Sequence, residues 1–277
     1  MTQTLAIYQV DAFTDQLFGG NAAAVVPVTQ WLPDAVMLQI AAENNLSETA
    51  YVREVSSGHV EIRWFSPLTE IDFCGHATLA AAEVWFRLQP DLECLRVSTQ
   101  KVGDLTVQKG SDGWHLMDFP ERLPMPMTEV PTALLAALPI APVEVLRSAQ
   151  AWFVVYAEAQ DVVTLTPDLA LLKQLGPYDV VVTAPAGNFG DGQYDFVSRY
   201  FWPANGGDED PVTGSIHAGL APYWGARLAK TQLLAYQAST RGGVLRLALS
   251  NQRVQVSGQA RLYLQGQIFI PAGASYG

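Results

Sequence analysis

Two stretches of the sequence share a pattern that constrains the fold more than any other feature. They read FSPLTEIDFCGHATLAAAEVWF, starting at residue 65, and FWPANGGDEDPVTGSIHAGLAPYW, starting at residue 201. With histidine counted as neutral, the first carries no charged residue between Asp72 and Glu83, and the second none between Asp210 and Arg227. A helix that is apolar on every face packs inside other structure rather than on a surface. The sequence therefore predicts two buried central helices.

The elements around these stretches are predicted to occur twice in the same order. Alternating and β-branched runs indicate two strands, a helix, two strands, the central helix and a meander, and the order then repeats. An ancient duplication explains this repetition. The predicted helices cover residues 33–45, 75–88, 167–175 and 214–230. The strands ahead of each central helix are predicted at Leu5–Phe13, Ala23–Val28, Ala50–Val55, Val60–Phe65, Val143–Arg147, Phe153–Ala157, Tyr178–Thr183 and Tyr194–Phe201.

The segment PERLPMPMTEVP separates the two halves. It contains four prolines in twelve residues, and proline lacks the backbone N–H that regular structure needs, so a linker is predicted. Pro222 likewise predicts a kink or an early break in the second central helix. The predicted domains are an N-terminal half, 1–119, with the motifs LSET and CGHAT, and a C-terminal half, 120–264, with EDPVTGS. A final strand, 265–277, can return to the N-terminal half.

Composition and charge narrow the function classes. The chain has 277 residues, 49% of them hydrophobic, and a net charge of −11 without a basic cluster, so a substantial core is expected and nucleic acid is not an expected partner. Neither a signal peptide nor a run of about 20 apolar residues is visible, which predicts a cytoplasmic protein without membrane spans. Cys74 and Cys94 imply no structural metal, and no P-loop, GxGxxG or GxSxG motif occurs.

The starts of the two central helices are candidate anion sites. Free backbone N–H groups and a partial positive charge at a helix N-terminus suit a small carboxylate. His76 and Ser215 lie in the predicted first turns, where they can face such a ligand. An alternative is that the neighbouring acids, Asp72 and the group Asp208, Glu209 and Asp210, only cap these helices.

Glu48 and Cys74 are further candidates. Glu48, in NNLSETAYV, lies just ahead of an apolar strand, where a carboxyl group partly removed from water can take and return a proton. It can equally be a loop acid or a partner in a local turn with Ser47. Cys74 can be a thiolate activated by a helix start, or a small buried apolar side chain.

The motifs VDAFTDQLFGGNAAAVV, NNLSETAYV, IDFCGHATLAAA and DEDPVTGSIHAGLA, in this order and spacing, resemble those of the PhzF-like phenazine-biosynthesis isomerase family. The resemblance covers essentially the whole chain. It implies an α/β (α+β) protein with the diaminopimelate epimerase fold: two similar halves, each a curled, mostly antiparallel sheet wrapped around a central helix. It also implies an active site in the cleft between the halves, no cofactor, and a homodimer.

The resemblance also implies roles for individual residues. Glu48 is expected to be the general acid/base that moves a proton between carbons of a small cyclic or unsaturated carboxylate. His76 and Asp210 are expected to be its polar partners in proton transfer. Gly75, Gly214 and Ser215 are expected to hold the carboxylate of the substrate.

One position departs from the pattern of the related amino-acid epimerases, which use two cysteines, one at each helix start. Here only Cys74 is present, and the second position corresponds to about Pro211, which cannot act as a base. The sequence therefore predicts a cofactor-independent isomerase centred on Glu48. Two alternatives stay open: an amino-acid epimerase or racemase that uses Cys74 with another base, and a catalytically silent ligand-binding protein of the same fold.

Overall fold

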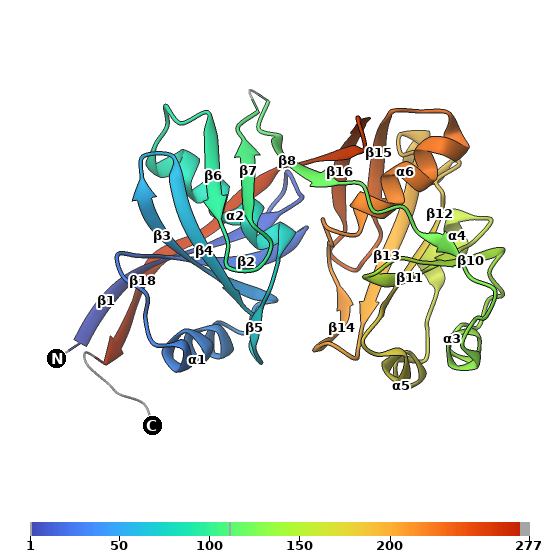
Figure 1. The fold of residues 1–277 in the computed structure, drawn as a ribbon, viewed down its shortest axis with the longest axis horizontal. Helices are drawn as coiled ribbons and strands as arrows, with labels where there is room; N and C mark the ends of the chain where they lie inside the picture. Colours follow the sequence, from blue (N-terminus) through green and yellow to red (C-terminus); the bar gives the residue numbers. More distant parts are fainter. Residues whose placement is uncertain (1, 111, 272–277) are drawn as a thin grey trace. The chain divides into compact units, whose positions relative to one another are not determined.

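The computed structural model describes residues 2–110 and 112–271, which fall into two compact units. One unit is drawn from Met1–Asp118 together with Ser257–Gly277, and the other is Phe119–Val256 (Figure 1). The chain returns to the first unit at residue 257, earlier than the predicted final strand at 265. Residues 272–277 of that predicted strand lie outside the described residues. The predicted division into 1–119, 120–264 and a final strand stays a prediction.

The first unit contains one mostly antiparallel sheet. Its pairings run β18–β1–β2–β3–β4–β6–β7–β8, and β5 pairs with the end of β4 that β6 does not reach. Only β2–β3 and β4–β6 are parallel, and a helix connects each of these two pairs, because parallel neighbours need a crossover. The strands are β1 (Thr2–Ala12), β2 (Asn21–Val28), β3 (Glu48–Ser56), β4 (His59–Phe65), β5 (Glu70–Ile71), β6 (Cys94–Ser98), β7 (Asp104–Gln108), β8 (His115–Pro120) and β18 (Ala260–Pro271).

The second unit repeats these pairings. β11–β12 and β13–β15 are parallel, β12–β13 and β15–β16 are antiparallel, and β14 pairs with the end of β13 that β15 does not reach. The prediction of two similar halves is therefore confirmed, strand by strand. The strands are β9 (Met125–Pro126), β10 (Glu144–Arg147), β11 (Ala151–Val155), β12 (Asp179–Pro185), β13 (Phe196–Trp202), β14 (Gly207–Asp210), β15 (Gln232–Gln237), β16 (Gly243–Ser250) and β17 (Arg253–Gly258).

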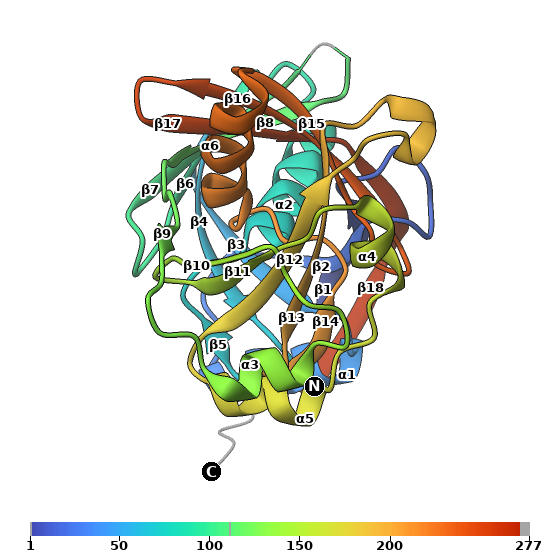
Figure 2. The same cartoon turned by 90° about the vertical axis from the view of Figure 1, so that its right-hand side faces the viewer.

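The central helix of the first unit, α2 (Gly75–Leu88), has the predicted bounds. Twelve of its 14 residues are buried, and it packs against β1, β2, β3 and β18, so the sheet covers it as its apolar sequence requires. A second helix, α1 (Asp34–Asn44), lies away from α2 in both views (Figures 1 and 2). Its residues Val36, Met37 and Ile40 join an apolar cluster with residues of β2 and β3.

The central helix of the second unit, α6 (His217–Leu228), runs through Pro222 without ending, so the predicted early break does not occur. A proline cannot donate to the carbonyl oxygen four residues earlier, here Ala218. That oxygen instead accepts a hydrogen bond of 2.9 Å from the backbone N–H of Arg122. The irregular segment between β8 and β9 thus replaces the bond that the proline removes.

Two other predictions need correction. The predicted linker PERLPMPMTEVP contains β9, which pairs with Leu146 and Arg147 of β10, because proline is tolerated in an edge strand of two residues. The predicted helix 167–175 begins at Leu169, because Asp168 caps it by accepting from the N–H groups of Ala170 and Leu171, and after Leu172 it continues as a 3₁₀ turn. The remaining helices are α3 (Thr132–Ala137), α4 (Ala159–Thr164), α5 (Leu169–Leu172) and the 3₁₀ turns Lys173–Leu175 and Phe189–Gly192.

Among the described residues, no helix combines the length and the apolar character that crossing a membrane requires.

Candidate functional site

Glu48 and His76 form a buried pair in the first unit. Glu48 is the first residue of β3, and His76 lies in the first turn of α2. Nε2 of His76 is 2.9 Å from Oε2 of Glu48, and the two side chains are 5% and 6% exposed. The contact has the distance of an ion pair, yet within the described parts of the chain Oε2 has no aligned hydrogen-bond donor. Such an oxygen is available to accept a proton.

The thiol of Cys74 lies against the same imidazole. Cys74 is the residue before α2, and its Sγ is 3.4 Å from Nδ1 and 3.9 Å from Nε2 of His76. Glu48, Cys74 and His76 are all buried, and one ligand atom from each lies within 4.8 Å of the others. The family resemblance implied a pairing of Glu48 with His76, but no sequence pattern showed that the sulfur of Cys74 joins them.

Burial and charge shift two pKa values in this cluster. Burial, and then the charge of Glu48, raises the pKa of Cys74 to about 11, so the thiol keeps its proton near neutral pH. Burial acts to lower the pKa of His76, but the charges of Cys74 and Glu48 outweigh it and raise that pKa well above its ordinary value. A protonated thiol carries no charge, so near neutral pH the carboxylate of Glu48 is the cause that remains.

Asn21 and Ser47 complete the first-unit site, and neither was predicted. Asn21, the first residue of β2, is fully buried. Its Nδ2 is 3.1 Å from Nδ1 of His76, and its Oδ1 accepts a hydrogen bond of 3.1 Å from the hydroxyl of Ser47. Ser47 precedes Glu48 in the chain. The amide of Asn21 therefore links the imidazole of His76 to the loop that carries Glu48. In the sequence, Asn21 could have been found only as part of the GGN in the first motif.

Asp210 lies at the end of β14 in the second unit. Its Oδ2 accepts a hydrogen bond from the hydroxyl of Thr213. Gln237 is fully buried and holds this segment from β15, because its Nε2 donates to the carbonyl oxygen of Asp210 and its Oε1 accepts from the N–H of Thr213, both at 2.9 Å. Asp210 thus belongs to a rigid turn rather than to a helix cap.

Gly214 and Ser215 lie in this turn, just ahead of α6, which begins three residues later than predicted. The carbonyl oxygens of Gly214 and Ser215 accept from the N–H groups of His217 and Ala218, at 3.2 and 3.1 Å. These bonds span three residues, as in a 3₁₀ turn, which is common at the start of an α-helix.

A hydrogen-bond chain that sequence reasoning missed leads to Ser215. The side-chain amide of Gln150 donates to Oγ of Ser215 and to the hydroxyl oxygen of Tyr200, both at 3.0 Å. Tyr200 in turn donates to Asp179 at 2.6 Å. Because Gln150 already donates to Oγ, the hydroxyl hydrogen of Ser215 is left to donate to another group.

Burial raises the pKa of Asp179 above its ordinary value, although hydrogen bonds from Tyr200 and Asn205 act to lower it.

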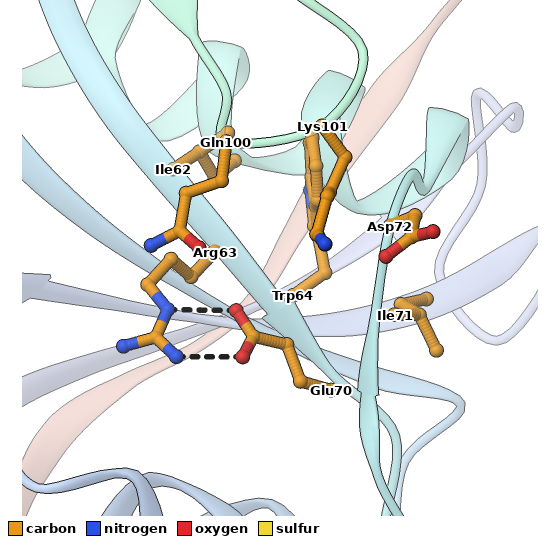
Figure 3. Close-up of a pocket in the computed structure, with 8 residues that line it drawn as sticks. All are labelled: Ile62, Arg63, Trp64, Glu70, Ile71, Asp72, Gln100 and Lys101. Carbon is orange, nitrogen blue, oxygen red and sulfur yellow. Dashed lines mark hydrogen bonds and ion pairs between the residues drawn. The ribbon is translucent and has the colours of Figure 1, made fainter.

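A cavity of about 120 Å³ lies elsewhere in the first unit (Figure 3). None of the predicted site residues lines it. Arg63 is its most buried charge, and its guanidinium already binds both oxygens of Glu70 at 2.7 and 2.6 Å and Asp34 at 2.9 Å. The full lining is Ile62, Arg63, Trp64, Glu70, Ile71, Asp72, Gln100 and Lys101.

Comparison with known proteins finds relatives that match almost the whole chain. The model of the PhzC-PhzF family, described as phenazine biosynthesis-like protein, matches residues 10–266. An uncharacterized isomerase of Pseudomonas aeruginosa is 46% identical over 267 residues, which cover 96% of this chain and 99% of that protein. Another uncharacterized isomerase, from Halalkalibacterium halodurans, is 40% identical over 268 residues, with 96% of this chain and 99% of that protein covered.

A solved structure confirms the predicted fold class. A phenazine biosynthesis protein of the PhzF family from Enterococcus faecalis superposes with a TM-score of 0.89 at 41% identity, covering 97% of this chain and 100% of that one. The chain therefore belongs to the PhzC-PhzF family of phenazine biosynthesis-like proteins, a family of isomerases.

Proposed function

We propose that this protein is a cofactor-independent isomerase that moves a proton between carbons of a small carboxylate substrate. Glu48 is the general acid/base, and His76 is its partner. The observation that carries the proposal is the buried oxygen of Glu48, which lies 2.9 Å from Nε2 of His76 and has no aligned donor among the described residues. A carboxylate in this setting can take a proton from one carbon and return it to another.

The imidazole of His76 supports both halves of this cycle. The positive charge of the ring, which lies 2.9 Å from Oε2, stabilises the carboxylate of Glu48 before the proton is taken. After Glu48 is protonated, the same ring keeps a polar neighbour for the carboxylic acid, which avoids an unpaired buried group. Asn21 holds the ring in place through the 3.1 Å contact with Nδ1.

The groups of the second unit are proposed to bind and polarise the substrate. Ser215 has a hydroxyl hydrogen left to donate. Gly214, the residue before it in the same turn, has no side chain to obstruct a ligand, so this turn suits a carboxylate. Gly75, at the start of α2, offers a backbone N–H to the same kind of group. Asp210 is proposed as a polar partner in proton transfer.

Deuterium incorporation tests the proposal. The wild type and Glu48→Gln are incubated in heavy water with a panel of small unsaturated and cyclic carboxylic acids, and mass spectrometry follows the label. We expect exchange that Glu48→Gln abolishes, because glutamine keeps the size of the side chain but cannot carry the proton. Glu54→Gln, near the exposed end of the same strand, is the matched control. Exchange that persists in Glu48→Gln would refute the assigned role.

An epimerase that uses Cys74 is the second candidate, since its sulfur lies 3.4 Å from the imidazole of His76. Alkylation separates the two. Cys94 is exposed and serves as the internal reference for labelling, whereas Cys74 is buried. Activity that survives a demonstrated adduct on Cys74 excludes the thiol as the base.

A third candidate is a protein that binds a carboxylate without turnover. Equal binding of an acid by the wild type and Glu48→Gln, with no exchange in either, would favour it. The homodimer that the family resemblance implies is part of the proposal, and light scattering of the full chain measures it.

A further inference from the structure

The cluster of Glu48, Cys74 and His76 also has the composition of a transition-metal site. We propose that these three side chains bind one thiophilic divalent cation, of which Zn²⁺ is the type, and that the bound cation blocks the isomerase. Binding of the cation needs no turnover, whereas the block of the isomerase rests on the proposed function. The cation is a regulatory ligand, not a cofactor for the reaction.

The donor set points to the class of cation. Thiolate sulfur, imidazole nitrogen and carboxylate oxygen together favour Zn²⁺ and Co²⁺, whereas Mg²⁺ and Ca²⁺ prefer oxygen alone. Three protein ligands leave a fourth tetrahedral position for water or an anion. All three residues are buried, so bulk water does not compete with them on every side.

The distances are close to those that a tetrahedral ion needs. Bonds of about 2.3 Å to sulfur and about 2.0 Å to nitrogen or oxygen set the ligand atoms about 3.3 to 3.6 Å apart. Here Nε2 of His76 is 2.9 Å from Oε2 of Glu48 and 3.9 Å from Sγ of Cys74. Small side-chain rotations that open the first distance and close the second would create the site.

The surroundings supply what a metal-bound histidine requires. When Nε2 binds a metal, Nδ1 carries a hydrogen and needs an acceptor. Asn21 lies 3.1 Å from Nδ1. Turning its amide over presents Oδ1 to the ring, and the hydroxyl of Ser47 can accept from the amide nitrogen as readily as it now donates to Oδ1.

Binding has a defined proton balance and consequence. The cation replaces the proton of the Cys74 thiol and the proton on Nε2 of His76, and both protons pass to the buffer. The imidazole and the carboxylate are then bound to metal and cannot exchange a proton with a substrate carbon.

The test titrates the full-length reduced protein with Zn²⁺ by calorimetry and with Co²⁺ by absorption spectroscopy. We expect one ion per chain and a sulfur-to-cobalt charge-transfer band in the near-ultraviolet. Cys74→Ser is expected to weaken Zn²⁺ binding by at least about 100-fold and to remove the band, whereas Cys94→Ser, which removes the exposed thiol, changes neither. Asn21→Ala is expected to weaken binding by about 10-fold.

Equal Zn²⁺ affinity in the wild type and Cys74→Ser, or bound Co²⁺ without the band, would overturn the proposal. If Cys74→Ser fails to fold, the spectra of the wild type and Cys94→Ser still decide. A Zn²⁺-loaded protein that exchanges deuterium faster than the metal-free protein would overturn the inhibitory role. The Co²⁺ spectrum needs no substrate, so its outcome is separate from that of the acid/base proposal.

Discussion

Nε2 of His76 lies 2.9 Å from Oε2 of Glu48, and both side chains are almost completely shielded from solvent. Glu48 is the first residue of β3 and His76 lies in the first turn of α2, 28 positions later in the sequence. Their pairing makes one chemical unit out of two motifs. The charge of Glu48 contributes to raising the pKa of His76, so the two residues are expected to act together.

The first prediction follows from this coupling. Glu48→Gln and His76→Gln should each reduce the exchange rate by about 10²- to 10⁴-fold, because each removes half of the acid/base unit. The double variant should lose no more than the worse single variant, since the second change removes nothing further. Rates of deuterium exchange for the four proteins form the double-mutant cycle. Additive losses would show that the two residues contribute independently.

The second prediction concerns Gln150 and Ser215. Gln150→Leu removes the donor that occupies Oγ of Ser215 at 3.0 Å, so the hydroxyl loses its fixed direction. We expect the KM of the exchange substrate to rise about 10-fold with little change in kcat, because the loss is one of binding geometry. Steady-state kinetics measure the split. Gln160→Leu, on the surface of α4, is the control, and a fall in kcat alone would contradict the positioning role.

The repeated order of elements could be predicted from the sequence because strand and helix signals are local. The bounds of α2 were predicted at 75–88 from the helix signals of GHATLAAAEVWFRL. Predictions failed where a long-range contact determines the local structure. β9 forms because it pairs with β10, and α6 continues through Pro222 because the N–H of Arg122 donates to the carbonyl oxygen of Ala218. Neither partner can be identified from a window of neighbouring residues.

The candidate site divides in the same way. Glu48, His76 and Ser215 stand in motifs that the sequence displays. Asn21 and Gln150 are 55 and 65 residues from the side chains that they orient, so only the folded chain shows their contacts. Cys74 could be predicted only in part. The sequence places it two residues before His76, but only the structure shows that its sulfur lies against the imidazole ring.

The third prediction tests how α6 tolerates its proline. A proline inside a helix ordinarily costs about 3 kcal/mol relative to alanine. Here the carbonyl oxygen of Ala218 already accepts from Arg122 at 2.9 Å, so a new N–H at position 222 gains little. Pro222→Ala should change the free energy of unfolding by less than about 1 kcal/mol. Urea unfolding measures it, and a gain near the full helix value would show that the bond from Arg122 does not compensate.

The last prediction uses His217, whose imidazole is fully buried in the second unit. Its Nδ1 lies 2.9 Å from the carbonyl oxygen of Thr213, and no donor or acceptor among the described residues meets Nε2. Burial lowers the pKa of His217 to about 4, although the bond to Thr213 acts in the opposite direction. In the unfolded chain the pKa is about 6.5. Between these values the unfolded state binds more protons than the folded state.

The contribution of His217 to the free energy of unfolding is therefore fully present above a pH of about 6.5. It is lost as the pH falls toward about 4. The loss from this residue should be about 3.5 kcal/mol, the shift of about 2.5 pH units multiplied by about 1.4 kcal/mol for each. Urea unfolding of the wild type and His217→Gln across this range measures it, and the variant should show a shallower acid slope. His59→Gln, at a half-buried histidine that binds Ser98, is the control. Parallel curves for the wild type and His217→Gln would show that the buried imidazole does not set the acid limit.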